Sequence, residues 1–269
     1  MNTFERRNKI INLVNKNGSI SVSKLSNSFG ISEVTIRADL RLLEEKGLVS
    51  RFHGGASKPM AHANGQPEDG AGGARERDSA ELGLEDRYPL AEDAKRRIAV
   101  VAAAMVKTGD TVILDSGSTT MLIAEELARF SNITVITNNL PAAYALSDNK
   151  EITLVICGGT VRHKTRSMHG TIAELSLNSI TADIMFVGAD GLDLEQGITT
   201  FNEGYAISDA MAKTARYVVA VLDSTKFGRR GFNLVLPIGK IDCIVTDSSI
   251  EAADRAALDA MEDLDVKIV

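Results

Sequence analysis

The chain has 269 residues, of which 44% are hydrophobic and 25% are charged, and its formal net charge is -6. This composition is typical of a globular protein, and no apolar run approaches the roughly 20 residues that a membrane-spanning helix needs. The first ten residues lack the apolar core of a secretory signal, and the two cysteines, Cys157 and Cys243, lie far apart in the sequence. We therefore expect no membrane segment and no disulfide framework, but a reduced cytoplasmic protein.

Charge and composition divide the chain into parts. Residues 1–58 contain ten Lys or Arg and five Asp or Glu, whereas the remaining residues contain twenty and thirty-one. The basic amino-terminal part is therefore the part that can approach a polyanion. Residues 58–83 are dense in Gly, Ala, Pro and charge and have neither a helical nor a strand period, which predicts a flexible linker. The predicted domains are residues 1–57 and 84–269, one on each side of this linker.

In the first 57 residues the pattern predicts three helices. The first covers residues 4–16 and ends at Asn17-Gly18, and the second covers about residues 21–29. Gly30 follows at a tight turn, where positive φ is needed, and the side-chain oxygen of Ser32 can cap the third helix. Three helices with a short turn before the third predict a helix-turn-helix at about residues 20–39.

The third helix separates an apolar face from a basic face. At 100° per residue, Ile36, Leu40 and Leu43 fall on one side, which predicts that this side is buried. The opposite side carries arginines, which can grip guanine or phosphate, and small apolar groups, which can meet a thymine methyl. This chemistry is typical of a helix that reads the major groove of double-stranded operator DNA. The candidate DNA contacts on this helix are Ser32, Val34, Thr35, Arg37, Ala38 and Arg41.

A wing is predicted directly after the third helix. Residues 48–56, LVSRFHGGA, show a short alternation of apolar and polar residues that ends in a Gly-Gly turn. Such a hairpin would carry Arg51 and His53 towards the DNA backbone. A basic face alone is common on solvated helices, and a helical module can bind protein instead of nucleic acid. The turn glycine, the capping serine and the wing occur together, and this combination favours DNA binding.

From residue 84 onward, helices alternate with short apolar strands. Strands are predicted within residues 111–115, 133–137, 152–159, 183–191, 218–223 and 243–247, and helices within 94–109, 121–130 and 206–216. This alternation predicts a mostly parallel sheet that is covered by helices on both faces.

Polar loops follow several of these strands, and the loops at the carboxyl ends of parallel strands converge on one edge of a sheet. The run LDSGSTTMLIAEEL places a strand, a hydroxyl-rich turn and a helix in that order, which favours an anion such as phosphate at the turn. An ordinary turn with a helix cap is the alternative interpretation. Lysine suits phosphate, whereas Asn, Asp and Glu suit hydroxyl groups. The candidate effector-binding residues are Asp115, Ser116, Gly117, Ser118, Thr119, Thr120, Asn138, Gly158, Gly159, Asp190, Glu203 and Lys226.

The segment HKTRSMHG contains His163 and His169, with Lys164 and Arg166 between them. Six residues is not a spacing that places two ligands on one helix face, and no third ligand is evident. We expect no metal and no cofactor, and we interpret the segment as a basic loop near the effector or at a subunit contact.

The run TIRADLRLLEEKGLVSRFHGGA, residues 35–56, resembles the amino-terminal signature of the DeoR family of bacterial transcriptional regulators. The resemblance covers residues 1–56 and 84–269. It implies a winged helix-turn-helix joined to an α/β domain similar to ribose-phosphate isomerase, with residues 116–120 as a phosphate loop. It also implies that Asp190 and Glu203 are remnants of acidic residues that move protons in the isomerases.

Within this family, the runs TNNLPAA, CGGTVRHKTRSMHGTIAE, GITTFNEGY and KFGRRGFNLVLPI most resemble repressors of galactitol utilisation, and repressors of glucitol and amino-sugar operons are close to them. The resulting hypothesis is a homo-oligomeric repressor that a phosphorylated sugar or polyol releases from operator DNA. The alternative is an active sugar-phosphate isomerase with an appended DNA-binding module.

Overall fold

A computed structural model of the chain describes residues 6–7, 9–11, 13–14, 19–45, 48–52, 55–57, 82–200, 207–231 and 233–269. The chain divides into two compact units, residues 1–74 and 75–269, and each unit is considered by itself. In this described part of the chain, no helix is long and apolar enough to cross a membrane. The linker predicted at residues 58–83 falls almost entirely outside the described residues, so its flexibility stays a prediction.

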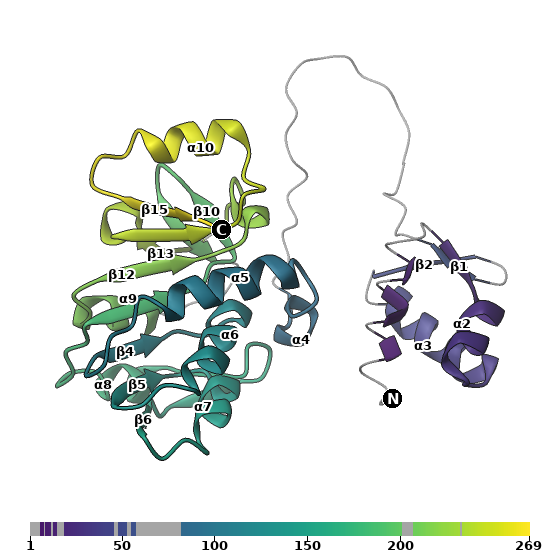
Figure 1. Cartoon of the computed structure of the whole chain (residues 1–269), viewed down its shortest axis with the longest axis horizontal. Coiled ribbons are helices and arrows are strands. Elements are labelled where there is room, and N and C mark those ends of the chain that lie inside the picture. The colour runs from purple at the N-terminus through teal and green to yellow at the C-terminus, as the bar shows by residue number, and fades with distance from the viewer. Residues whose placement is uncertain are drawn as a thin grey trace. The chain divides into compact units, whose positions relative to one another are not determined.

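The first unit combines helices with a small antiparallel sheet (Figure 1). Residues 6–7, 9–11 and 13–14 are helical, within the range predicted for the first helix. The other elements are β1 (Ser19–Ser21), α2 (Val22–Phe29), α3 (Glu33–Glu45), β2 (Ser50–Phe52) and β3 (Gly55–Ser57), and the strand order is β1-β3-β2. Because β2 and β3 pair antiparallel with Phe52 opposite Gly55, the backbone of the predicted wing is present.

The turn between α2 and α3 depends on Gly30. This residue has φ 64 and ψ 34, and its backbone N–H donates to the carbonyl oxygen of Ser26 at the end of α2. A left-handed conformation of this kind carries no steric cost for glycine. The helix-turn-helix predicted from the sequence is therefore confirmed, including its turn residue.

The predicted apolar face of α3 forms the core of the first unit. Ile36, Leu40 and Leu43 are at most 2% exposed, and they pack with Ile10 and Leu25 from the preceding helices. Burying an aliphatic side chain of this size contributes about 1.5–3 kcal/mol. The orientation of α3, and therefore of its open face, is set by this packing.

The second unit is built on a seven-stranded parallel sheet with the order β15-β14-β12-β9-β4-β5-β6. The apolar alternation predicted from the sequence provides these strands, and the prediction of a parallel sheet is confirmed. The strands are β4 (Thr111–Leu114), β5 (Ile133–Thr137), β6 (Ile152–Ile156), β9 (Ile184–Val187), β12 (Val218–Val221), β14 (Cys243–Thr246) and β15 (Asp265–Ile268).

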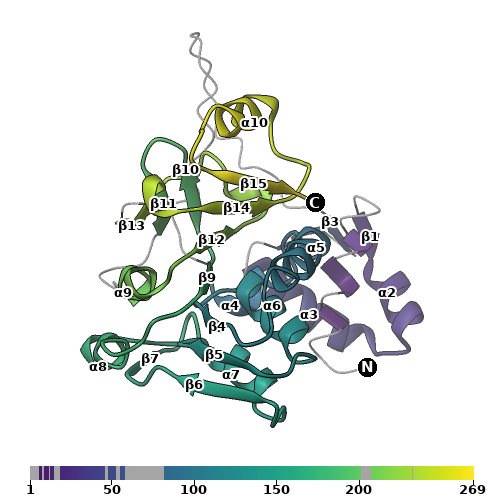
Figure 2. The same cartoon turned by 60° about the vertical axis from the view of Figure 1, so that its left-hand side comes forward.

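Successive residues of the central strands enter two different cores, because side chains alternate across a strand. In β4, Val112 and Leu114 pack in the core that contains α5, α6 and α7, whereas Ile113 packs in the core that contains α8, α9 and α10. Figure 2 shows α5 and α6 on one side of the sheet and α9 on the other. These helices are α5 (Glu92–Ala103), α6 (Ser118–Leu127), α7 (Leu140–Leu146), α8 (Thr171–Leu175), α9 (Ile207–Thr214) and α10 (Ala252–Asp259).

Shorter elements complete the second unit. The strands β7 (Thr160–Arg162) and β8 (Ser167–His169) form a hairpin, and β10 (Gly191–Asp193), β11 (Gly197–Thr200) and β13 (Asn233–Pro237) form an antiparallel sheet. The short helix α4 (Leu84–Arg87) precedes α5, and the 3-10 turns η1 (Ser224–Lys226) and η2 (Ile238–Lys240) follow β12 and β13.

The strand order reverses at β4. From β4 the chain builds β5 and β6 on one side, and it then returns to place β9 on the other side of β4. In an open parallel sheet, a ligand crevice forms at the carboxyl ends of the two strands that flank such a reversal. The candidate residues Asp115 and Asp190 follow β4 and β9, respectively, so both lie at this position of the sheet.

Candidate functional site

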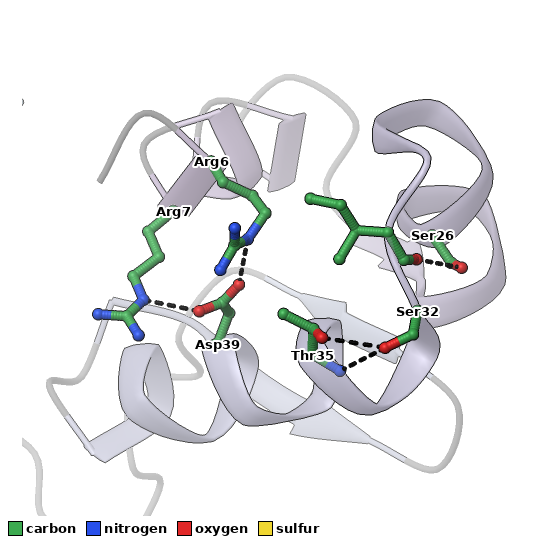
Figure 3. Close-up of polar contacts among 7 residues, drawn as sticks. Arg6, Arg7, Ser26, Ser32, Thr35 and Asp39 are labelled. Atoms are coloured by element: carbon green, nitrogen blue, oxygen red, sulfur yellow. Dashed lines mark hydrogen bonds and ion pairs between the residues drawn. The ribbon is translucent and has the colours of Figure 1, made fainter. Parts of the chain in front are cut away.

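The amino terminus of α3 is fixed by two serines (Figure 3). The hydroxyl of Ser32 accepts from the backbone N–H of Thr35 at 3.3 Å, as predicted for a helix cap, and it also lies 2.9 Å from the hydroxyl of Thr35. The hydroxyl of Ser26 donates to the carbonyl oxygen of Ile31 at 2.7 Å. Together these bonds hold the turn and the first residues of the helix that the sequence predicts to read DNA.

The open face of α3 carries the predicted mixture of arginine and small apolar residues. Val34 is 77% exposed, Ala38 and Arg41 are exposed, and the side chain of Arg37 is 57% exposed. The guanidinium of Arg37 pairs with Glu33 at 2.9 Å, one turn earlier in the same helix. Exposed pairs of this type are weak, so Arg37 is available for a phosphate or a base edge.

Helix α3 also carries a buried carboxylate that was not predicted from the sequence. Asp39 is 2% exposed and accepts from the Nε atoms of Arg6 and Arg7 at 2.5 and 2.8 Å (Figure 3). The spacing of residues could have predicted this burial, because Asp39 lies three residues after Ile36 and four before Leu43 on the apolar stripe. A charge on a buried stripe needs a partner of opposite charge, and Arg6 and Arg7 provide it.

The wing is described only in part. Arg51 lies in β2, but its side chain is not among the described groups, and His53 lies outside the described residues. Their contact with the DNA backbone therefore stays a prediction.

A pocket lies in the second unit where the strand order reverses. It is lined by residues of α4, α5, the start of α6 and η1, together with the segments that follow β4 and β9. The structure brings seven of the candidate effector residues together here, namely Asp115, Ser116, Gly117, Ser118, Thr119, Asp190 and Lys226.

Helix α6 begins at the wall of this pocket. Gly117 is its N-cap, with φ 152 and ψ 167, and no side chain among the described residues caps the helix. A residue with a Cβ rarely adopts this φ. Ser118 and Thr119 form the first turn and are each 6% exposed. The uncapped N–H groups and the dipole of this ten-residue helix favour an anion in the pocket.

Three basic side chains, Arg87, Lys95 and Lys226, line the same pocket. Lys95 is 2% exposed, and its ammonium donates to the carbonyl oxygen of Arg87 at 2.7 Å. Burial lowers the pKa of Lys95 to about 8; Asp223 opposes this shift, whereas Lys226 and Arg87 add to it. Burial also lowers the pKa of Lys226, against the attraction of Asp223 and with a contribution from Arg87. The three cations are therefore close enough to repel one another, and an anion among them would relieve that repulsion.

Two carboxylates line the pocket beside these cations. Asp115 is 3% exposed, and burial raises its pKa although it accepts from the hydroxyl of Ser208 at 2.5 Å and from the N–H of Ser116 at 2.6 Å. Asp190 accepts from the hydroxyl of Thr200 at 2.7 Å. The pocket thus combines positive groups with oxygen acceptors, which is the mixture that a ligand with both phosphate and hydroxyl groups requires.

Four other candidate effector residues, all within the described ranges, are not among the residues that line this pocket. Thr120 is fully buried, and its hydroxyl donates to a carbonyl oxygen of the same turn at 3.1 Å. Asn138 is fully buried, and its amide donates to a carbonyl oxygen of β8 at 3.2 Å. Gly158 and Gly159 lie beside α8. Glu203 lies outside the described residues.

Sequence reasoning missed Arg87 and Lys95. Lys95 had a signal, because it precedes Ile98 and Ala99 by three and four residues and therefore lies on the apolar stripe of α5. Arg87 lies in a four-residue helix, where no periodicity marks it. From the segment HKTRSMHG, Thr165 and His169 reach the pocket lining. Within the described ranges, no group of three or more His, Cys, Asp or Glu is arranged to hold a metal ion.

A winged helix-turn-helix with an exposed basic helix face, in one chain with an α/β unit that holds a charged pocket, defines a two-domain transcriptional regulator. The family description "DeoR-like helix-turn-helix domain" matches residues 6–60, and "DeoR C terminal sensor domain" matches residues 91–248. The chain therefore belongs to the DeoR family of transcriptional regulators. It is a regulator and not an enzyme, so the isomerase alternative is not favoured.

Known proteins similar to this chain include other regulators. The "Putative aga operon transcriptional repressor" of Escherichia coli O157:H7 is 35% identical over 93% of this chain and 88% of that protein. The "Glycerol-3-phosphate regulon repressor" of Escherichia coli K12 is 28% identical over 92% of each chain. Among solved structures, ribose 5-phosphate isomerase A of Methanocaldococcus jannaschii matches 51% of this chain and 55% of its own, with 23% identity and a TM-score of 0.39.

The buried carboxylate of α3 leads to a stability prediction. Replacing Asp39 by Asn leaves Arg6 and Arg7 without their anion, so Asp39→Asn is expected to destabilise the first unit by about 2–4 kcal/mol. Hydrogen exchange of the α3 amides as a function of urea measures this loss. Glu33→Gln is the matched control, because it removes a carboxylate from an exposed pair on the same helix and is expected to cost less than about 0.5 kcal/mol. Equal effects of the two changes would show that Asp39 does not anchor the helix.

The buried ammonium of Lys95 leads to a second prediction. Its pKa in the folded protein is about 8, below that of an unfolded lysine, about 10.4. The unfolded state therefore binds more protons between these values, and the stability of the second unit rises with pH in this window and is lowest below pH 8. Lys95→Met removes this dependence. At pH 7 we expect it to stabilise the unit by about 1–2 kcal/mol, since the lost bond to Arg87 offsets part of the gain.

Thermal unfolding of both proteins from pH 7 to 10.5 checks the prediction for Lys95. A Lys95→Met variant that is less stable than the parent at pH 7 would show that the buried ammonium stabilises the second unit. A variant that keeps the parent's pH dependence would show that Lys95 does not cause this dependence.

Proposed function

We propose that the protein is a repressor of a sugar or polyol catabolic operon, that it acts in the cytoplasm, and that a phosphorylated sugar or polyol in the pocket of the second unit releases it from operator DNA. The observation that carries this proposal is the convergence of three basic side chains and an uncapped helix amino terminus on one pocket. The carboxylates of Asp115 and Asp190 would accept from hydroxyl groups, whereas Lys95, Lys226 and α6 would hold the phosphate, since Arg87 is already paired with Asp190.

The charge of the pocket selects the class of ligand. A neutral sugar would leave the ammonium groups of Lys95 and Lys226 in the buried positions that lower their pKa values, whereas a dianion would compensate their charge. The names of two similar proteins, an aga operon repressor and a glycerol-3-phosphate regulon repressor, support a ligand from carbohydrate metabolism. Galactitol utilisation is the specific pathway that the sequence resemblance favours, and a phosphorylated galactitol is therefore the first ligand to test.

Release follows from linkage between the two ligands. An effector that binds more tightly to the DNA-free protein lowers the affinity for DNA by the same factor by which DNA lowers the affinity for the effector. We further propose a homo-oligomer, because one helix-turn-helix reads too few base pairs to give a useful specificity ratio.

Selection of binding sequences from a random pool of DNA duplexes tests the DNA-binding half of the proposal. Recovered sequences with two related half-sites, spaced by about one or more helical turns, would support an oligomeric repressor. Recovery of no preferred sequence, or of single half-sites only, would contradict it. Sugar and polyol phosphates, galactitol phosphates among them, are then screened for release of a selected duplex.

Arg37 is expected to contribute to operator binding. Arg37→Ala should weaken binding to a selected duplex by about 1–3 kcal/mol, because it removes a bidentate base contact or a charge-assisted phosphate contact. Arg96→Ala is the matched control: Arg96 has a similarly exposed side chain, 55% against 57%, and also pairs with a glutamate four residues earlier. A gel-shift titration that finds the same affinity for parent and Arg37→Ala would rule out this contact.

Ser118 is expected to contribute to the effector site. Ser118→Asp places a carboxylate at the amino terminus of α6, where it would occupy the donors and repel a dianion. The variant should bind DNA like the parent but should not be released by the effector. Thr171→Asp is the control, because Thr171 also begins a helix after a glycine N-cap but lies outside the pocket lining.

Isothermal titration with the effector and DNA binding are measured on the same Ser118→Asp protein, since a carboxylate that mimics bound phosphate would instead lock the released state. If the variant binds both effector and operator like the parent, residues 116–120 form a turn without a role in the effector site.

A further inference from the structure

The helix α4 occupies a particular place in the chain. Its four residues, Leu84–Arg87, are the first helix of the second unit after the long segment that joins this unit to the DNA-binding unit in the sequence. Figure 1 shows α4 next to the end of α5. A one-turn helix has little stability of its own, so the bonds that α4 makes to its surroundings determine where it lies.

One set of bonds attaches α4 to the hairpin of β7 and β8. The backbone N–H of Leu84 donates to the carbonyl oxygen of Lys164 at 2.9 Å, and the carboxylate of Glu85 pairs with Arg166 at 2.6 Å. Thr165, between these two hairpin residues, lines the pocket. The basic loop that stood out in the sequence is therefore one of the two supports of α4.

The second set of bonds attaches α4 to the pocket itself. The guanidinium of Arg87 pairs with Asp190 at 2.9 Å, and its Nε also donates to the carbonyl oxygen of Leu82 at 2.9 Å. The carbonyl oxygen of Arg87 accepts from the ammonium of Lys95 at 2.7 Å. Arg87, Lys95 and Asp190 all line the pocket. The groups that hold the end of α4 are thus the groups that a charged ligand in the pocket would engage.

A strained residue connects α4 to α5. Ala91, at the N-cap of α5, has φ 49 and ψ 37. This left-handed conformation costs an L-residue other than glycine free energy that a change of backbone conformation would release. Movement of α4 relative to α5 would turn about this residue.

We propose that α4 is a latch that transmits occupancy of the pocket to the DNA-binding unit. An anionic ligand draws the ammonium of Lys95 away from the carbonyl oxygen of Arg87, so α4 leaves the pocket wall. This proposal rests on the effector pocket proposed above and adds how its occupancy is signalled.

The strengths of the competing hydrogen bonds determine that an anion moves α4 away from the pocket wall and not towards it. Hydrogen bonds to an ionised acceptor are roughly twice as strong as those to a neutral one, so a phosphate oxygen outcompetes the carbonyl oxygen of Arg87 for the Lys95 ammonium. The carbonyl oxygen then loses its charged donor and keeps the 3.3 Å bond from the N–H of Leu90, next to a negative charge that repels it. Exposure of this carbonyl to water removes that cost, and exposure requires the carboxyl-terminal end of α4 to move.

Hydrogen exchange of the full-length protein, with inorganic phosphate as the probe and chloride at matched ionic strength as the reference, tests the latch. We expect phosphate to slow exchange of the first-turn amides of α6, at residues 118–120. It should also speed exchange several-fold at Leu84 and Leu90, whose N–H groups donate to Lys164 and Arg87 when α4 is in place.

The possible outcomes distinguish failure of the proposed latch from failure of the proposed effector pocket. Slower exchange at residues 118–120 without a change at Leu84 and Leu90 would overturn the latch and leave the effector site standing. Slower exchange at both places would overturn the proposed release, since α4 would then be tightened. No effect at residues 118–120 would overturn both the pocket and the latch.

A substitution at Ala91 tests the latch without touching the pocket. Ala91→Gly removes the cost of the left-handed conformation and so favours the latched state, and we expect it to reduce the phosphate-induced exchange at Leu84 and Leu90 by about threefold to tenfold. Asn132→Gly is the matched control, because Asn132 also has a positive φ of 54 and lies outside the pocket lining. Equal responses of the two variants would contradict a hinge at Ala91.

Discussion

The reversal of strand order at β4 is the constraint on which the pocket of the second unit depends. Because β5 and β9 lie on opposite sides of β4, the segments that follow β4 and β9 separate at the carboxyl edge of the sheet. Asp115 and the start of α6 come from the first segment, and Asp190 comes from the second. No single stretch of sequence contains the pocket, and the topology alone brings these groups to one place.

Buried charge has opposite roles in the two units. In the first unit, two arginines surround the carboxylate of Asp39, so the ion is compensated and holds α3 in position. In the second unit, the ammonium of Lys95 donates to a neutral carbonyl oxygen and lies near Asp223 but also near two further cations, so its charge is compensated only in part. A compensated ion fixes a structure, whereas a poorly compensated ion favours whatever anion can reach it. Buried charge can therefore support rigidity beneath α3 and would favour binding of an anion at the pocket.

The sequence predicted most of the fold and seven of the twenty residues that line the pocket, for physical reasons. Periodicity located α3, its buried residues Ile36, Leu40 and Leu43, and the parallel strands, because burial repeats with a fixed period. Turn chemistry located Gly30 and Ser32. Periodicity does not reveal which side chains from distant elements meet, and Arg87 was missed for this reason. Asn138 and Thr120 were predicted in the site because they have suitable chemistry. Both side chains donate to backbone carbonyl oxygens, and Asn138 also hydrogen-bonds to Asp115 of the pocket.

A pocket explains regulation only if its ligand binds two states of the protein with different affinities. Tight binding to a rigid pocket would leave the affinity for DNA unchanged, however large the cationic charge. The α4 anchors supply a difference, because the Lys95 to Arg87 bond exists in one state and competes with the ligand. One or two hydrogen bonds of about 1 kcal/mol each, together with the conformational cost at Ala91 of about 1 kcal/mol, give a coupling of about 1–3 kcal/mol. Allosteric proteins operate in this range, which corresponds to a change in affinity of roughly 5- to 150-fold. A one-turn helix held by a few bonds is therefore strong enough to carry the signal and weak enough to be released by one small anion.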